Sequence, residues 1–135
     1  MSDSDNPNTT GLLLFAHGAR DPNWALPFQA VATRCRAQRG EGRVALAFLE
    51  FMAPGLVAGG TALVAAGCTV VDVVPLFLGA GGHVRKDIPV LVARLQAAHP
   101  AVHFSLRPAI GEATVVIDAM AAVALAPAGA EVAVR

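Results

Sequence analysis

The sequence predicts an α/β fold: a three-layer sandwich around a four-stranded parallel sheet with strand order 2-1-3-4. Four short apolar runs alternate with four segments of helical period, which is the pattern of consecutive βα units. The third run is almost wholly apolar, as expected for a central strand covered on both faces. Right-handed crossovers then restrict the topology to a few arrangements, of which this order places the first and third strands at the centre.

The first half of the chain supplies two βα units. A strand is expected over residues 12–16, followed by a helix that begins at Asp21-Pro22, an N-cap residue and a favoured first helical residue. A second strand over residues 44–49 precedes a helix between Pro54 and Gly67. The stripe of the first helix that should pack on the sheet consists of Trp24, Phe28, Val31 and Cys35.

The second half repeats the pattern. A strand over residues 69–76 leads to a helix that begins near residues 84–87 and ends at His99-Pro100. Apolar and polar residues alternate over residues 102–107, which indicates an edge strand with one wet face, and a last helix follows over residues 112–125. We therefore expect a single domain over 11–125, a disordered N-terminal segment over 1–10 and a frayed tail over 126–135.

The composition excludes several classes of protein. The chain has 135 residues, of which 55% are hydrophobic and 15% charged, so it can build the core of one globular domain. Ten basic and ten acidic residues cancel, which argues against a nucleic-acid partner. No apolar run reaches the ~18 residues of a membrane span, and the start of the chain lacks the features of a signal peptide. We expect a cytoplasmic protein without a membrane partner, in which Cys35 and Cys68 are inert thiols.

Two histidines are the strongest functional signal. His17 follows the first predicted strand in the segment AHGARDP, and His83 follows the third in the segment PLFLGAGGHVRKDIP. Because the carboxyl ends of parallel strands meet at one edge of the sheet, both imidazoles should face the same crevice. Glu50 follows the second strand and would reach the same edge. Imidazole and carboxylate suit divalent first-row metals, so these three residues are the predicted metal-binding and catalytic groups.

The residues around the histidines suit a large, flat, acidic ligand. The glycines before His83, including Gly81 and Gly82, let such a ligand approach the backbone closely. The residues expected to bind the substrate are Arg20, Phe77, Leu78, Gly81, Gly82 and Arg85, with arginines pairing with carboxylates. The same features have plainer interpretations: Glu50 can simply solvate a loop, and the glycine-rich loop can cradle a phosphate, although its spacing matches no phosphate-binding motif.

These residues and the segments around them resemble those of a known protein family. From about residue 12 to 123 it resembles the small CbiX-type sirohydrochlorin chelatases of the class II chelatase superfamily, on the segments AHGARDP, AFLEFMAPGL and VVPLFLGAGGHVRKDIP. The resemblance implies a lyase that inserts Co²⁺ or Fe²⁺ into sirohydrochlorin for cobalamin or sirohaem biosynthesis. His17 and His83 match the two metal-binding catalytic histidines of the family, and Glu50 stands where related chelatases have an acidic residue. The metal is then a substrate, and no further cofactor is required.

The resemblance also implies a homodimer. Larger chelatases of this superfamily contain two similar halves with the active cleft between them, and this chain looks like one half-domain. A second copy would therefore be needed to cover a macrocycle. The competing hypotheses are a non-catalytic metal-binding or delivery protein, a phosphate- or nucleotide-binding module, and a nickel chelatase within the same family.

Overall fold

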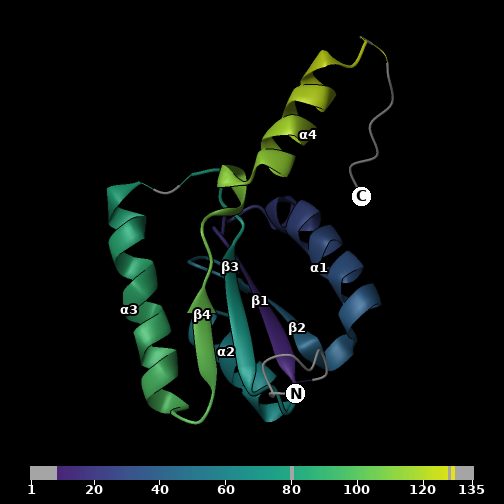
Figure 1. The fold of residues 1–135 in the computed structure, drawn as a ribbon. Helices are drawn as coiled ribbons and strands as arrows, with labels where there is room; N and C mark the ends of the chain where they lie inside the picture. Colours follow the sequence, from purple (N-terminus) through teal and green to yellow (C-terminus); the bar gives the residue numbers. More distant parts are fainter. Residues whose placement is uncertain (1–8, 80, 128, 130–135) are drawn as a thin grey trace.

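The computed structural model describes residues 9–79, 81–127 and 129 and forms the predicted three-layer sandwich (Figure 1). Its sheet has four parallel strands in the order β2-β1-β3-β4, which confirms the predicted order. The strands are β1 (Thr10–Ala16), β2 (Val44–Phe48), β3 (Val70–Pro75) and β4 (His103–Leu106). Residue 10 already belongs to β1, and most of the predicted disordered start and frayed tail lie outside the described residues.

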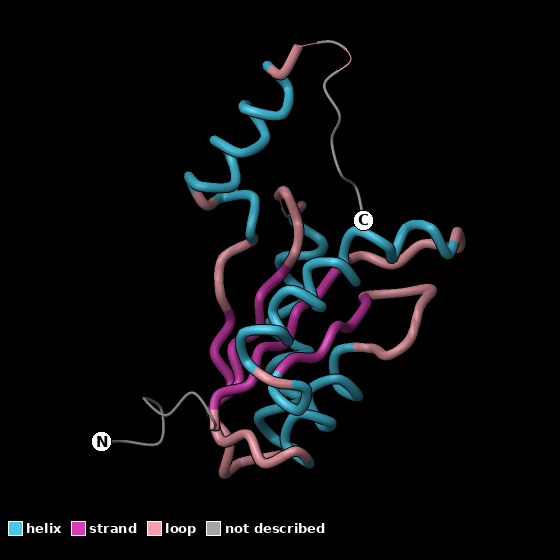
Figure 2. The backbone as a smooth tube through the Cα atoms, turned by 90° about the vertical axis from the view of Figure 1, so that its right-hand side faces the viewer, coloured by secondary structure: helices cyan, strands magenta, loops and turns pink. Residues whose placement is uncertain are grey.

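Helices cover the two faces of the sheet unequally (Figure 2). One face carries α2 (Leu56–Ala65) and α3 (Gly82–Ala98), and the other carries α1 (Leu26–Arg39). The remaining elements are α4 (Thr114–Leu125) and the short 3₁₀ turns η2 (Pro22–Ala25), η3 (Glu41–Arg43) and η4 (Ile110–Glu112). None of the helices in the described ranges is long and apolar enough to cross a membrane.

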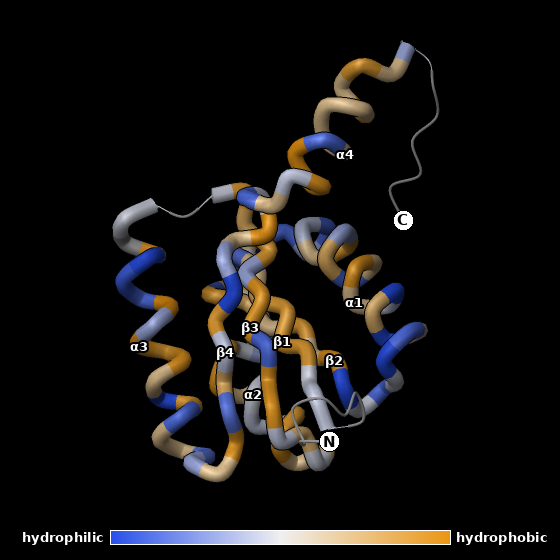
Figure 3. Tube along the Cα trace, viewed as in Figure 1, coloured by the Kyte–Doolittle hydropathy of each residue, from blue (hydrophilic) through white to orange (hydrophobic). Residues whose placement is uncertain are grey.

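The larger core lies between the sheet and the pair α2 and α3. Along β3, buried and half-buried residues alternate, with Val71, Val73 and Pro75 buried on this side. The alternation follows from the two-residue period of a strand. Apolar residues concentrate in the sheet strands in Figure 3. The carboxyl ends of β1, β2 and β3 are thus held by a closely packed centre.

The start of the first helix differs from the sequence-based expectation. Asp21 does act as an N-cap, accepting a hydrogen bond from the Asn23 amide at 2.9 Å, but the turn that it caps is η2 and not α1. The α-helix begins only at Leu26, with a proline in its first turn. This change of helix type shifts the helical phase, so Trp24 (44% exposed) and Val31 (39% exposed) are partly exposed and belong to none of the core clusters of the described residues, contrary to the prediction.

Two other helix starts differ by a few residues. Pro54 does not open α2, which begins at Leu56 after an N-cap at Gly55. The helix α3 begins at Gly82, earlier than the predicted residues 84–87, so His83 is its second residue. The glycine-rich segment is therefore partly helical, and not entirely a loop.

Candidate functional site

His17 stands directly at the carboxyl end of the central strand β1. Its ring is half-buried and stacks on the ring of Phe77, with centroids 4.2 Å apart and an interplanar angle of 28°. Phe77 is itself only 3% exposed and packs against Phe15 in the core at 5.9 Å. The imidazole therefore rests on a fixed aromatic floor, a contact worth about 0.5–1.5 kcal/mol beyond its buried area.

The backbone of His17 is held as firmly as its ring. The indole Nε1 of Trp24 donates a hydrogen bond to the His17 carbonyl oxygen at 2.7 Å. Within the described part of the chain, no group forms a hydrogen bond with either ring nitrogen of His17. The side chain is thus positioned by stacking and by its main chain, and no described residue competes with a ligand for its ring nitrogens.

The loop after β2 presses against the loop that carries His17. A Cβ atom added to Gly18 would overlap the carbonyl oxygen of Glu50, so the two backbones touch. The Leu49 amide also donates to the Ala16 carbonyl at 2.9 Å, which continues the β1–β2 ladder one residue beyond the end of β2. Glu50 is exposed, and its carboxylate has no partner among the described residues. The structure therefore brings the segments of His17 and Glu50 together, as the sequence predicts.

The loop after β3 is fixed in the same way. The Leu76 amide donates to the Phe15 carbonyl at 2.7 Å, and the Gly111 amide donates to the Phe77 carbonyl at 2.9 Å. A Cβ atom at Gly111 would overlap the backbone of Leu78. Three loops thus converge on the edge of the sheet at which His17 lies, each locked by main-chain contacts.

The second predicted histidine lies in the first turn of the helix that follows β3. His83 follows Gly81 and Gly82 at the start of α3, and the Arg85 amide donates to the Gly81 carbonyl at 3.0 Å. The side chain of His83 lies outside the described part of the structure. The described residues contain no group of three metal-binding side chains, so the ligand set of His17, Glu50 and His83 remains a prediction.

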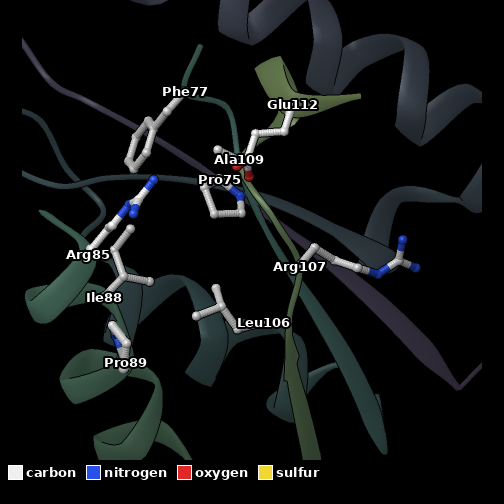
Figure 4. A pocket seen from close by; sticks show the side chains of 9 residues that line it. All are labelled: Pro75, Phe77, Arg85, Ile88, Pro89, Leu106, Arg107, Ala109 and Glu112. Atoms are coloured by element: carbon white, nitrogen blue, oxygen red, sulfur yellow. The ribbon is translucent and has the colours of Figure 1, made fainter. Parts of the chain in front are cut away.

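An open pocket of about 330 Å³ adjoins Phe77 between α3 and the end of β4. Figure 4 shows Arg85 extending from α3 toward Phe77, whereas Arg107 points away from the pocket. Arg107 instead contacts Asp72 at 3.3 Å on the other side of the sheet. The lining residues are Pro75, Phe77, Arg85, Ile88, Pro89, Leu106, Arg107, Ala109 and Glu112. Of the predicted substrate-binding residues, this pocket brings together Phe77 and Arg85.

The other predicted substrate-binding residues lie around the edge. Arg20 is exposed and its guanidinium lies over the ring of Phe51, 5.3 Å from the centroid. Leu78 is 69% exposed and Phe51 60% exposed, so both offer apolar surface to solvent at this edge. A Cβ atom at Gly81 or Gly82 would meet no described atom within 4 Å. Both glycines therefore border open space.

Sequence reasoning missed three contributors to this site. Gly18 and Gly111 matter because another backbone touches them, and Trp24 matters through its bond to His17. The glycine directly after His17 in AHGARDP was a usable signal, since close backbone approach is a main reason for a glycine in a loop. No local sequence pattern identifies Gly111 or Trp24. Gly111 contacts Leu78, which is distant in the chain, and Trp24 bonds to the His17 carbonyl, which lies outside the helical pattern.

The structure of a putative cobalamin (vitamin B12) biosynthesis CbiX protein from Marinobacter aquaeolei VT8 matches with a TM-score of 0.75 and 32% identity, over 85% of this chain and 93% of that one. The sirohydrochlorin chelatase SirB from Bacillus subtilis subspecies spizizenii, solved in complex with cobalt, matches with a TM-score of 0.67 and 30% identity, over 74% of this chain and 43% of that one. The fold is therefore that of a chelatase-like α/β domain.

The family model for CbiX matches residues 11–125. The chain belongs to the CbiX family. A curated relative, the sirohydrochlorin ferrochelatase of Bacillus subtilis (strain 168), is 31% identical over 100 residues, which is 74% of this chain. The aligned part is only 38% of that relative, so the chain spans less than half of its length.

Proposed function

We propose that this protein inserts a divalent metal, Co²⁺ or Fe²⁺, into sirohydrochlorin, acting as a homodimer. The observation that carries the proposal is His17, held by its ring face and its carbonyl on the central strand, with both ring nitrogens unengaged among the described residues. The support from relatives is the match to a sirohydrochlorin ferrochelatase and to a chelatase solved with cobalt. Both metals accept imidazole and carboxylate donors.

In this proposal His17 and His83 bind the incoming metal ion and replace part of its water shell. The stacking of His17 on Phe77 fixes the direction of the ring, which lowers the ordering cost of binding. Glu50, on the loop that touches Gly18, would contribute a third donor. A partial ligand set of this kind leaves coordination positions open, so the metal can pass to the macrocycle nitrogens.

The macrocycle would lie against the exposed apolar residues at the sheet edge. Phe51 and Leu78 offer apolar surface, and the flat ring would lie beside Gly81 and Gly82, which border open space. Arg20 and Arg85 are the candidates to pair with the carboxylates of the substrate. Insertion also releases two pyrrole protons, and an imidazole not bound to metal, or the Glu50 carboxylate, is suited to accept them.

The dimer is proposed because one copy offers one half of a cleft. The chain covers 38% of one relative and 43% of another, while it matches a CbiX protein of nearly its own length. A flat macrocycle bound at the edge of a single sheet would keep one face in water. A second copy would cover that face.

The test is anaerobic absorbance spectroscopy of sirohydrochlorin with purified protein and either Co²⁺ or Fe²⁺. We expect metallation well above the protein-free rate, with His17→Ala and His83→Ala each slower by about 100-fold or more, since each removes a metal donor. His103→Ala is the matched control, because His103 is an exposed histidine of β4 outside the proposed site. Tight metal binding with no acceleration of metallation would refute the chelatase and favour a metal-delivery protein.

A further inference from the structure

The loop after β2 contains a turn of unusual geometry. The Met52 amide donates to the Glu50 carbonyl at 2.8 Å, so Phe51 is the central residue of a three-residue γ-turn. Its φ angle is 66°, and no other non-glycine residue in the described ranges has a positive φ. The form of the γ-turn with a positive central φ is rare and strained. Glycine adopts it without a steric cost, whereas a bulky aromatic residue does not.

Core packing does not offset the strain at Phe51. Its ring is exposed and belongs to none of the core clusters of the described residues. The next residue, Met52, is half-buried and packs on the cluster that contains Phe48. The turn thus returns the chain to the core, which glycine at the central position would do with less strain. Strained residues of this kind concentrate at functional sites.

The Phe51 ring contacts the loop that carries His17. The guanidinium of Arg20, three residues after His17, lies over this ring at 5.3 Å from its centroid. A guanidinium that stacks through its face keeps the N–H groups at its edge free, so the contact is compatible with the proposed pairing of Arg20 with a substrate carboxylate. The stack joins the loop after β1 to the loop after β2.

The position of Glu50 depends on the same turn. Its carboxylate has no partner among the described residues, so side-chain contacts there do not orient it. Its carbonyl oxygen accepts the hydrogen bond from the Met52 amide and touches the backbone at Gly18. The place from which the Glu50 side chain projects is therefore set by the backbone of the γ-turn and by the neighbouring loop.

We propose that Phe51 is a positioning residue for Glu50. Its γ-turn and its stack on Arg20 hold the Glu50 backbone against the loop of His17, so a metal ion at His17 meets the carboxylate without first ordering the loop. A lower ordering cost gives a higher metal affinity. Because the stack joins the two loops to each other, they keep their relative position when either moves. The inference rests on the proposed function, in which Glu50 is the third metal donor.

The test is calorimetric titration of the full chain with Co²⁺ alone, together with urea unfolding of the metal-free protein. Phe51→Gly should raise the Kd for Co²⁺ by about 10-fold, the size seen when a partner that orients a metal ligand is lost. The urea midpoint should stay the same or rise, because glycine removes the strain of the positive φ. Phe51→Tyr is the matched control, since it keeps the aromatic ring, and it should leave both values unchanged.

A double-mutant cycle tests whether Phe51 acts through Glu50. Glu50→Gln alone should raise the Kd for Co²⁺ by about 10-fold or more, and Phe51→Gly should add nothing in that background. An equal loss from Phe51→Gly in both backgrounds would show that Phe51 does not act through Glu50, and would overturn the inference. A lower urea midpoint for Phe51→Gly would mean that the ring stabilises the loop by ordinary packing, and would overturn it as well.

The outcomes separate this inference from the proposed function. If Glu50→Gln binds Co²⁺ as tightly as the wild type, Glu50 is not a donor and the positioning role of Phe51 is wrong. Metallation of sirohydrochlorin that is lost in His17→Ala would still support the chelatase. Coupling between Phe51 and Glu50 in Co²⁺ binding, without any metallation, would support the positioning role and refute the chelatase.

Discussion

The contact between Gly18 and the Glu50 carbonyl is the most sensitive point of the site. Gly18→Ala places a methyl group where the Glu50 backbone already lies. A flexible side chain could move aside, but here the neighbour is backbone, tied by the Leu49 bond to Ala16 and by the Met52 amide bond to Glu50 at 2.8 Å. Gly18 does not have a positive φ angle, so the loss of stability in Gly18→Ala comes from the contact with Glu50 and not from backbone strain.

The size of the effect follows from the cost of overpacking. Forcing a methyl group into an occupied position costs about 1–3 kcal/mol, which for a chain of this length lowers Tm by about 4–12 °C. Because the loops must move apart, Glu50 also moves away from His17, and the metallation rate should fall more than the stability loss alone explains.

The assay is urea unfolding monitored by circular dichroism, together with the metallation rate below the transition. Gly42→Ala is the control, since a Cβ atom there meets Ala66 at 3.5 Å, an ordinary contact. We expect a lower midpoint with an unchanged m-value for Gly18→Ala and little change for the control. Equal midpoints for Gly18→Ala and wild type would show that the two loops do not press on one another as described.

Three further substitutions test separate contacts. Phe77→Leu removes the aromatic ring on which His17 stacks. We expect it to lower the free energy of unfolding by about 1–2 kcal/mol, measured by urea unfolding, and to lower metal affinity by more, measured by calorimetric titration. Unchanged affinity would contradict the positioning role of the ring. Trp24→Phe keeps an aromatic ring but loses the hydrogen bond to the His17 carbonyl. We expect the free energy of unfolding to fall by about 1 kcal/mol and the KM for metal to rise. An unchanged KM would contradict a role of this hydrogen bond in positioning His17. Arg107→Gln should change stability by less than about 1 kcal/mol because the pair with Asp72 is 58% and 18% exposed, and a larger loss in urea unfolding would show that this pair matters more than its exposure indicates.

The sheet could be predicted from sequence because its information is local. Each strand is a short apolar run, and the third run, from Val70 to Pro75, is apolar enough to identify a central strand. Chain connectivity and the handedness of crossovers then left few possible strand orders, and the predicted one is confirmed. That order also places the loops that follow β1 and β2 side by side, as the contact between Gly18 and the Glu50 carbonyl shows.

The details that shape the site could not be predicted in the same way. The stripe through Trp24 and Val31 failed because a 3₁₀ turn that begins at Pro22 precedes α1, and such a turn has fewer residues per turn than an α-helix. The role of Gly111 depends on the position of Leu78, more than 30 residues away along the chain. Such contacts form only in the packed fold, so the periodicity of apolar residues along the sequence does not predict them.

Main-chain hydrogen bonds to β1 restrict the motion of the loops that follow β2 and β3. The amides of Leu49 and Leu76 are tied to β1 at the very residues that precede His17, so their hydrogen exchange should require opening of the whole sheet. The exposed amides of α4 in an isolated copy would instead exchange by local fraying. We therefore expect His17 to belong to the slowest-exchanging unit of the molecule, and any movement during the proposed metal insertion to come from the segments around it, such as the loops of Arg20 and Phe51.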